Sequence, residues 1–99
     1  MKIINEKEFA NEIKEGVVLV DFFATWCGPC RMMASILEDV DKELGGKGKI
    51  VKVDVDQNEN LAKQFAVMSI PTLVLFKDGK MVSRHAGVMQ KNDCLKLFK

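Results

Sequence analysis

Two cysteines separated by two residues, Cys27 and Cys30, are the residue pair in this sequence with the clearest chemical potential. Residues at positions i and i+3 of a helical turn face the same side, with Cβ atoms about 5–6 Å apart. A small tightening of such a turn brings two sulfur atoms within disulfide distance. We therefore expect a pair that opens and closes with little backbone movement.

The pair lies where an apolar, strand-like run passes into a helical pattern, so that Cys27 comes at the helix N-terminus. Unpaired backbone N–H groups and the positive end of the helix dipole favour a thiolate there. Pro29 fits a first helical turn, where its missing N–H is not needed, and Gly28 leaves the approach to the sulfur open. This context predicts Cys27 as a nucleophile and Cys30 as the resolving cysteine.

Two other uses of such a pair remain open on the residues alone. A structural disulfide across so short a loop gains little from chain entropy, which disfavours that reading. Tetrahedral zinc needs a second pair of ligands, and the further candidates His85 and Cys94 lack ligand spacing, so we expect no metal site. Cys94 itself falls within an apolar helical arc, which favours a buried, inert thiol over a reactive or dimerising one.

The composition sets limits on the kind of protein. With 99 residues, 47% of them hydrophobic, and a net charge of +1, we expect one globular domain over residues 1–99. The balance of charge favours neither a nucleic-acid nor a membrane partner. The longest apolar run, residues 17–24, is interrupted by Asp21 and is too short to span a membrane. The acidic residue Glu6 precedes any apolar stretch of the length that a signal peptide needs. An odd number of cysteines also argues against a secreted framework, so we expect a soluble cytoplasmic protein.

The elements that must position the dithiol can be read from the apolar pattern. Strands are expected at residues 17–23, 49–55, 72–76 and 81–85, the last two joined by a hairpin at Asp78-Gly79. Helices are expected for about ten residues from Asn5, and at 27 or 28–44, 59–65 and 91–98. Early alternation of strand and helix favours parallel pairing and the hairpin adds an antiparallel part, which predicts a mixed sheet covered on both faces.

Helical spacing also predicts which side chains face the core. In the first helix, Asn5 and Glu8 form a capping-box pattern, and Phe9, Ala10 and Ile13 are assigned to the inner face. In the second helix, Met32 and Met33 are interpreted as core-filling residues.

Residues 21–32, DFFATWCGPCRM, resemble the signature of the thioredoxin family. Other family landmarks follow in the same order at residues 52–56, 70–72, 76–79 and 86–87, so the resemblance covers essentially the whole chain. It implies an α/β thioredoxin fold, with a central mixed five-stranded sheet flanked by helices on both faces. The Gly28-Pro29 dipeptide between the cysteines is the one associated with the reductases of this superfamily.

The resemblance also implies roles for residues around the dithiol. Asp21 corresponds to a buried aspartate that assists proton transfer at the second cysteine, and Lys52 to the lysine that modulates it. From the residues alone, burial of Asp21 is favoured over an outward orientation, and Lys52 is equally well the polar half of an alternating strand. Pro71 corresponds to a cis proline beside the dithiol, which leaves the backbone of Ile70 free to pair with an extended substrate. The implied docking surface comprises Trp26, Gly28, Pro29, Ile70, Pro71, Ala86 and Gly87.

The implied reaction is the general reduction of protein disulfides, with the Cys27–Cys30 disulfide as the oxidised product. A thioredoxin reductase, linked to NADPH or to ferredoxin, would regenerate the dithiol, and diverse disulfide-containing proteins would be substrates. We expect a monomer without a bound cofactor, because the sequence has no nucleotide-binding glycine loop. A non-catalytic binding subunit of a larger assembly, with the same fold, is the alternative function.

Overall fold

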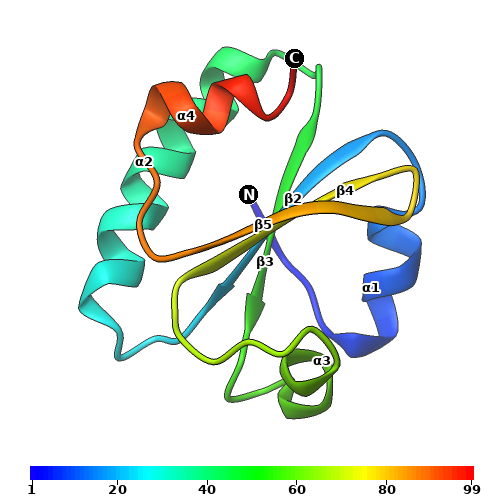
Figure 1. The fold of residues 1–99 in the computed structure, drawn as a ribbon, viewed down its shortest axis with the longest axis vertical. Coiled ribbons are helices and arrows are strands. Elements are labelled where there is room, and N and C mark those ends of the chain that lie inside the picture. The colour runs from blue at the N-terminus through cyan, green and yellow to red at the C-terminus, as the bar shows by residue number, and fades with distance from the viewer.

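A five-stranded mixed sheet forms the centre of the computed structural model, which describes residues 1–99. The strands lie in the order β1-β3-β2-β4-β5 (Figure 1). Strands β1, β3 and β2 are parallel, whereas β4 is antiparallel to β2 and β5 to β4. Their bounds are β1 Lys2–Ile3, β2 Val17–Phe23, β3 Lys49–Asp54, β4 Thr72–Lys77 and β5 Lys80–Ala86. The predicted mixed, five-stranded fold class is confirmed.

Four strands lie within one residue of their predicted bounds, but the sequence pattern did not locate β1. This strand has two residues and pairs with β3, with Lys2 opposite Val51 and Ile3 opposite Lys52. Two residues are too few to show the alternation by which a strand is recognised.

Four helices cover the two faces of the sheet (Figure 1). Their bounds are α1 Glu6–Ile13, α2 Gly28–Leu44, α3 Glu59–Gln64 and α4 Lys91–Lys96. Helices α1 and α3 lie on one face, and α2 and α4 on the other. None of them is both long enough and apolar enough to cross a membrane.

The predicted capping box starts α1. The side chain of Asn5 accepts a hydrogen bond from the backbone N–H of Glu8 at 3.0 Å, and the Glu8 carboxylate accepts one from the backbone N–H of Asn5 at 3.0 Å. Two N–H groups without helical partners are thereby satisfied.

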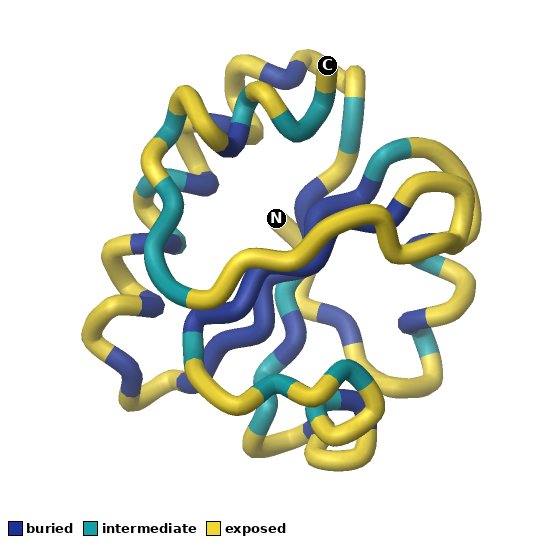
Figure 2. The backbone as a smooth tube through the Cα atoms, viewed as in Figure 1, coloured by how far each residue is buried: buried dark blue, intermediate teal, exposed yellow.

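The core has two main parts, one on each side of the sheet. Even-numbered residues of β2, such as Val20 and Phe22, pack with Phe9 of α1 and Leu61 of α3. The odd-numbered Leu19 belongs to the cluster that includes residues of α2 and α4. Figure 2 shows the buried strands between helices whose outer sides are exposed. Burial on both faces explains the continuous apolar run of β2.

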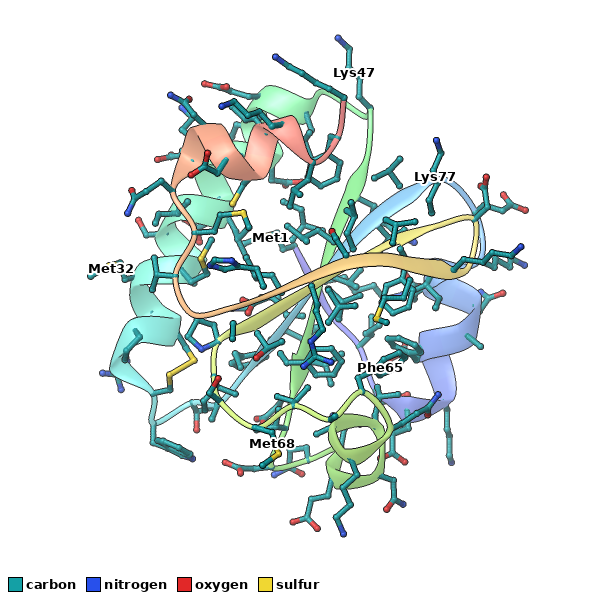
Figure 3. The ribbon with its side chains drawn as sticks, viewed as in Figure 1. Met1, Met32, Lys47, Phe65, Met68 and Lys77 are labelled. Atoms are coloured by element: carbon teal, nitrogen blue, oxygen red, sulfur yellow. A yellow bond between two sulfur atoms is a disulfide. The ribbon has the colours of Figure 1, made fainter.

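Two predicted core positions are wrong. Met33 is buried, but its neighbour Met32 is 59% exposed and points away from the sheet (Figure 3). Adjacent helical residues are separated by about 100° of rotation, so the side of α2 that faces the sheet includes Met33 but not Met32. Ala10 is likewise exposed, because Phe9 and Ile13, one turn apart, already form the buried side of the two-turn helix α1.

The two edges of the sheet differ in length. Strand β1 is two residues long, whereas all seven residues of β5 are exposed. The pairing of β4 with β5 has a register shift between Leu75 and Phe76. Such an irregularity increases the local twist of an edge strand.

Candidate active site

Cys27 is the N-cap residue of α2 and follows closely on the central strand β2. Its backbone is extended (φ −88°, ψ 115°), and its sulfur accepts a hydrogen bond from the backbone N–H of Cys30 at 3.2 Å. An N–H group and the positive end of a 17-residue helix therefore both point at the Cys27 sulfur. An N–H donor and the positive end of a helix are features that stabilise a thiolate.

Cys27 and Cys30 are joined by a disulfide, with Cα atoms 5.2 Å apart, so the structure describes the oxidised state. Both residues are buried, whereas Gly28 and Pro29 between them are exposed. Pro29 lies in the first turn of α2, where no backbone donor is required. The bond lies at the start of α2 (Figure 3).

The loop before β4 lies directly against the dithiol. The sulfur of Cys27 is 3.8 Å from the backbone carbonyl oxygen of Ile70. The peptide bond between Ile70 and Pro71 is cis. The backbone N–H of Gly87 donates to the carbonyl of Pro71 at 2.8 Å, which brings the end of β5 to the same side.

Trp26 lies on the exposed surface next to the dithiol and the Ile70 loop. Its indole is 67% exposed, and its Nε1–H donates to the carboxylate of Asp56 at 2.8 Å. A hollow of about 210 Å³ next to it is lined by Trp26, Val55, Val67, Met68, Ser69 and Ile70. Val67 and Met68 line this hollow, although the sequence analysis did not single them out. Their place before Ile70 in the sequence was the available signal.

Asp21 is fully buried in the centre of the sheet, opposite Lys52 of β3 and Leu73 of β4. Neither carboxylate oxygen accepts a hydrogen bond from the protein. Burial raises the pKa of Asp21 from 3.8 to about 6, and the nearby positive charge of Lys52 partly opposes this rise. Asp21 is thus a buried carboxyl group that titrates close to neutral pH.

Lys52 is the sheet partner of Asp21 and also lines a hollow next to Cys30. Its ammonium group lies 4.4 Å from the centre of the Phe23 ring, in cation–π contact. A second hollow of about 210 Å³ extends from Lys52 to Cys30 and is lined by Phe23, Ala24, Thr25, Cys30, Arg31, Ala34 and Lys52. The hollow therefore brings Lys52 and Cys30 together, and Asp21 is the sheet partner of Lys52 in β2.

The remaining cysteine and the single histidine lie apart from the dithiol. Cys94 is buried in α4, with its sulfur 3.8 Å from the carbonyl oxygen of Met89. Burial, followed by the charges of Asp93 and Asp21, raises the pKa of the Cys94 thiol to about 11. His85 is exposed on β5, with a ring nitrogen 3.4 Å from the carbonyl oxygen of Val88. No three His, Cys, Asp or Glu side chains gather into a metal-binding group.

A family model described as Thioredoxin matches residues 1–99. The thioredoxin of Bacillus subtilis is 52% identical over 86 residues, which cover 87% of this chain and 83% of that protein. The thioredoxin of Chlamydia trachomatis is 46% identical over 98 residues, covering 99% of this chain and 95% of that protein.

A solved structure agrees with these sequence matches. The X-ray structure of Fasciola hepatica thioredoxin superposes with a TM-score of 0.86 at 38% identity, and each chain is covered completely. The similarity therefore extends over every strand and helix described above, the dithiol loop included.

Replacing Asp21 with Asn is expected to stabilise the protein at pH 7. The pKa of Asp21 is raised on folding, so folding favours the protonated form. The stability associated with that form is present below pH 4 and is lost as the pH rises through about 6. From this shift, the advantage of the variant in free energy of unfolding should grow by about 2–3 kcal/mol between pH 4 and pH 7.

Urea unfolding of both proteins at several pH values measures this difference. Asp41→Asn, which removes an exposed carboxylate from α2, serves as the matched control and should show little pH-dependent change. A difference for Asp21→Asn that is constant from pH 4 to pH 7 would contradict the raised pKa.

Cys94 is expected to resist alkylation in the folded, reduced protein, because its thiol is buried and its pKa is about 11. Cys27 should react rapidly with iodoacetamide at pH 7. Peptide mass mapping after timed labelling distinguishes the two sites, and urea-unfolded protein gives the rate for accessible Cys94. Equal labelling rates for Cys94 and Cys27 in the folded protein would show that Cys94 is reactive.

Proposed function

Since the chain belongs to the thioredoxin family and is a thiol–disulfide oxidoreductase, we propose that Cys27 is its nucleophile and Cys30 its resolving cysteine. The observation that carries this assignment is the hydrogen bond from the Cys30 N–H to the Cys27 sulfur at the start of α2. That bond and the helix dipole stabilise a thiolate at Cys27 specifically.

The proposed reaction has two exchanges. The Cys27 thiolate attacks one sulfur of a protein disulfide; the S–S bond of the substrate breaks, and its departing thiolate takes a proton from solvent. A mixed disulfide now joins Cys27 to the substrate. The Cys30 thiol then loses its proton and attacks the Cys27 sulfur, releasing the second substrate thiolate. Two electrons pass to the substrate, and the Cys27–Cys30 disulfide remains.

Asp21 is proposed as the proton acceptor for Cys30. A carboxyl group with a pKa of about 6 is largely ionised at pH 7, yet it is basic enough to accept a proton. Lys52 modulates this basicity, because its positive charge favours the ionised carboxylate. Lys52, the sheet partner of Asp21, lines the same hollow as Cys30, which supports a proton transfer from Cys30 toward Asp21.

Substrate is proposed to bind as an extended segment beside Ile70. The backbone N–H groups of Met68, Ser69 and Ile70 donate to no backbone acceptor in the structure, so the edge they form is available for strand-like pairing. Trp26, Gly28 and Pro29 border the dithiol on the helix side. Ala86 and Gly87 lie beside Pro71, because Ala86 pairs with Thr72 and the Gly87 N–H donates to the Pro71 carbonyl. A mostly apolar surface of this kind suits varied protein partners.

The redox group is the chain's own cysteine pair, which needs no bound cofactor for disulfide exchange. We propose that a thioredoxin reductase, NADPH- or ferredoxin-linked, restores the dithiol and that residues 1–99 act as one monomeric domain in the cytoplasm. The alternative of a non-catalytic binding subunit is not favoured, because the cysteine pair is intact and the chain is similar to thioredoxins over most of its length.

Cys30→Ser is expected to trap substrate proteins as stable mixed disulfides, because attack by Cys27 remains while resolution is lost. Cys27→Ser should trap none. Non-reducing electrophoresis after incubation with disulfide-bonded insulin separates the two outcomes. Trapping by Cys27→Ser, and not by Cys30→Ser, would reverse the roles assigned to the two cysteines.

Asp21→Asn is expected to slow the resolution step several-fold at pH 7 and to leave the first attack nearly unchanged. The reason is that Cys30 loses its proton acceptor while the surroundings of Cys27 at the helix terminus stay intact. Rapid-quench kinetics with insulin resolves the accumulation and decay of the mixed disulfide. A variant with unchanged decay would remove Asp21 from the mechanism.

A further inference from the structure

Residues 65–71, between α3 and β4, form one side of the proposed docking surface. Few hydrogen bonds within this segment hold it in place. At its start, the Phe65 ring packs between Phe9 and Phe76 at centroid distances of 5.3 and 5.5 Å. At its end, the Thr72 hydroxyl donates to the Ser69 carbonyl at 2.6 Å. Met68, between these anchors, is 93% exposed. The path of this segment therefore depends on the turn that follows Phe65.

That turn passes through a residue in an unfavourable backbone conformation. Ala66 has φ +51°, a left-handed geometry in which the Cβ of an L residue crowds its own backbone. The N–H of Ala66 donates to the Lys63 carbonyl at 3.0 Å, and the N–H of Val67 to the Ala62 carbonyl at 2.9 Å. No backbone N–H donates to the carbonyl groups of Phe65 and Ala66.

Arg84 of β5 supplies donors to these two carbonyl groups. Its guanidinium donates from Nη1 to the Phe65 carbonyl at 2.6 Å and from Nη2 to the Ala66 carbonyl at 3.2 Å. Arg84 pairs with Val74 in the sheet and is in no salt bridge, so these two carbonyls are its polar contacts in the structure. A planar fork with two donors fits two neighbouring carbonyls, and its positive charge suits the negative end of α3.

We propose that Arg84 is a positioning residue for protein substrates: by bonding the carbonyls of Phe65 and Ala66, it holds the segment that carries Val67, Met68 and Ile70 in the docking position. This inference rests on the proposed function. Arg84 does not touch the dithiol; it acts through the left-handed turn. Phe65 and Met68 are labelled in Figure 3, in the stretch of chain that follows α3.

The consequence is selectivity by substrate size. A protein disulfide uses the hollow beside Trp26 and the Ile70 backbone as well as Cys27, so it depends on the position of residues 67–70. A small disulfide such as bis(2-hydroxyethyl) disulfide needs access to the Cys27 sulfur and little more. Loss of Arg84 lowers the fraction of molecules with a docking-competent segment, and the apparent affinity for protein substrates falls by that fraction.

The test compares Arg84→Ala with the parent protein, using dithiothreitol as the electron donor. The KM for insulin is expected to rise about five- to tenfold with kcat nearly unchanged. The rate with bis(2-hydroxyethyl) disulfide should stay the same. Lys80→Ala, which removes an exposed cation from the other end of β5, is the matched control and should match the parent with both substrates.

Two further variants separate positioning from general loss of structure. Arg84→Lys keeps the charge but lacks the two-donor fork, so its KM for insulin should fall between those of the parent and Arg84→Ala. Adding Ala66→Gly to Arg84→Ala should recover part of the KM, because glycine adopts the left-handed turn without the Cβ cost. Amide hydrogen exchange should accelerate at Ala66 and Val67 in Arg84→Ala and return toward the parent rate in the double variant.

An unchanged insulin KM in Arg84→Ala overturns the proposal, as does an equal loss of rate with both disulfides. Failure of the proposed function gives a different result, because the parent protein itself would then not reduce insulin. Thermal unfolding of each variant verifies that the temperature of the kinetic assay lies well below the unfolding transition.

Discussion

Strand β2 is paired on both edges and packed on both faces, and six of its seven residues are buried. A strand with this environment cannot shift its register without moving every side chain to the opposite face of the sheet. Because α2 begins five residues after β2 ends, the fixed strand also fixes the helix terminus. The position of Cys27, and through it the geometry of the disulfide, depends on this burial.

The same strand carries the least favourable charge in the molecule. Asp21 lies two residues after Leu19, on the face of β2 that packs against α2, and neither of its oxygens has a hydrogen-bond donor. Its sheet partner Lys52 lies over the Phe23 ring. A buried ionisable group of this kind lowers stability unless it is well paired. Violations of core rules concentrate at functional sites, which supports the role proposed for this carboxyl group.

Sequence reasoning predicted those parts of the structure that depend on local patterns. The long apolar run of β2, the capping box at Asn5 and the Asp78-Gly79 hairpin were each readable because the signal lies within a few residues. The dithiol was also recognisable, since its chemistry follows from spacing and from the strand-to-helix context.

Features that depend on distant neighbours were not predictable in this way. Nothing near Arg84 in the sequence indicates that it bonds to carbonyls 18 and 19 residues earlier. The two residues of β1 form a strand only because β3 is there to pair with them.

Both edges of the sheet are poor templates for self-association. Strand β1 is too short, while β5 carries Lys80, Arg84 and His85 and pairs irregularly with β4. In the function proposed above, backbone pairing with another chain is thus confined to the few residues beside Cys27, whereas the two sheet edges disfavour pairing between copies of this protein.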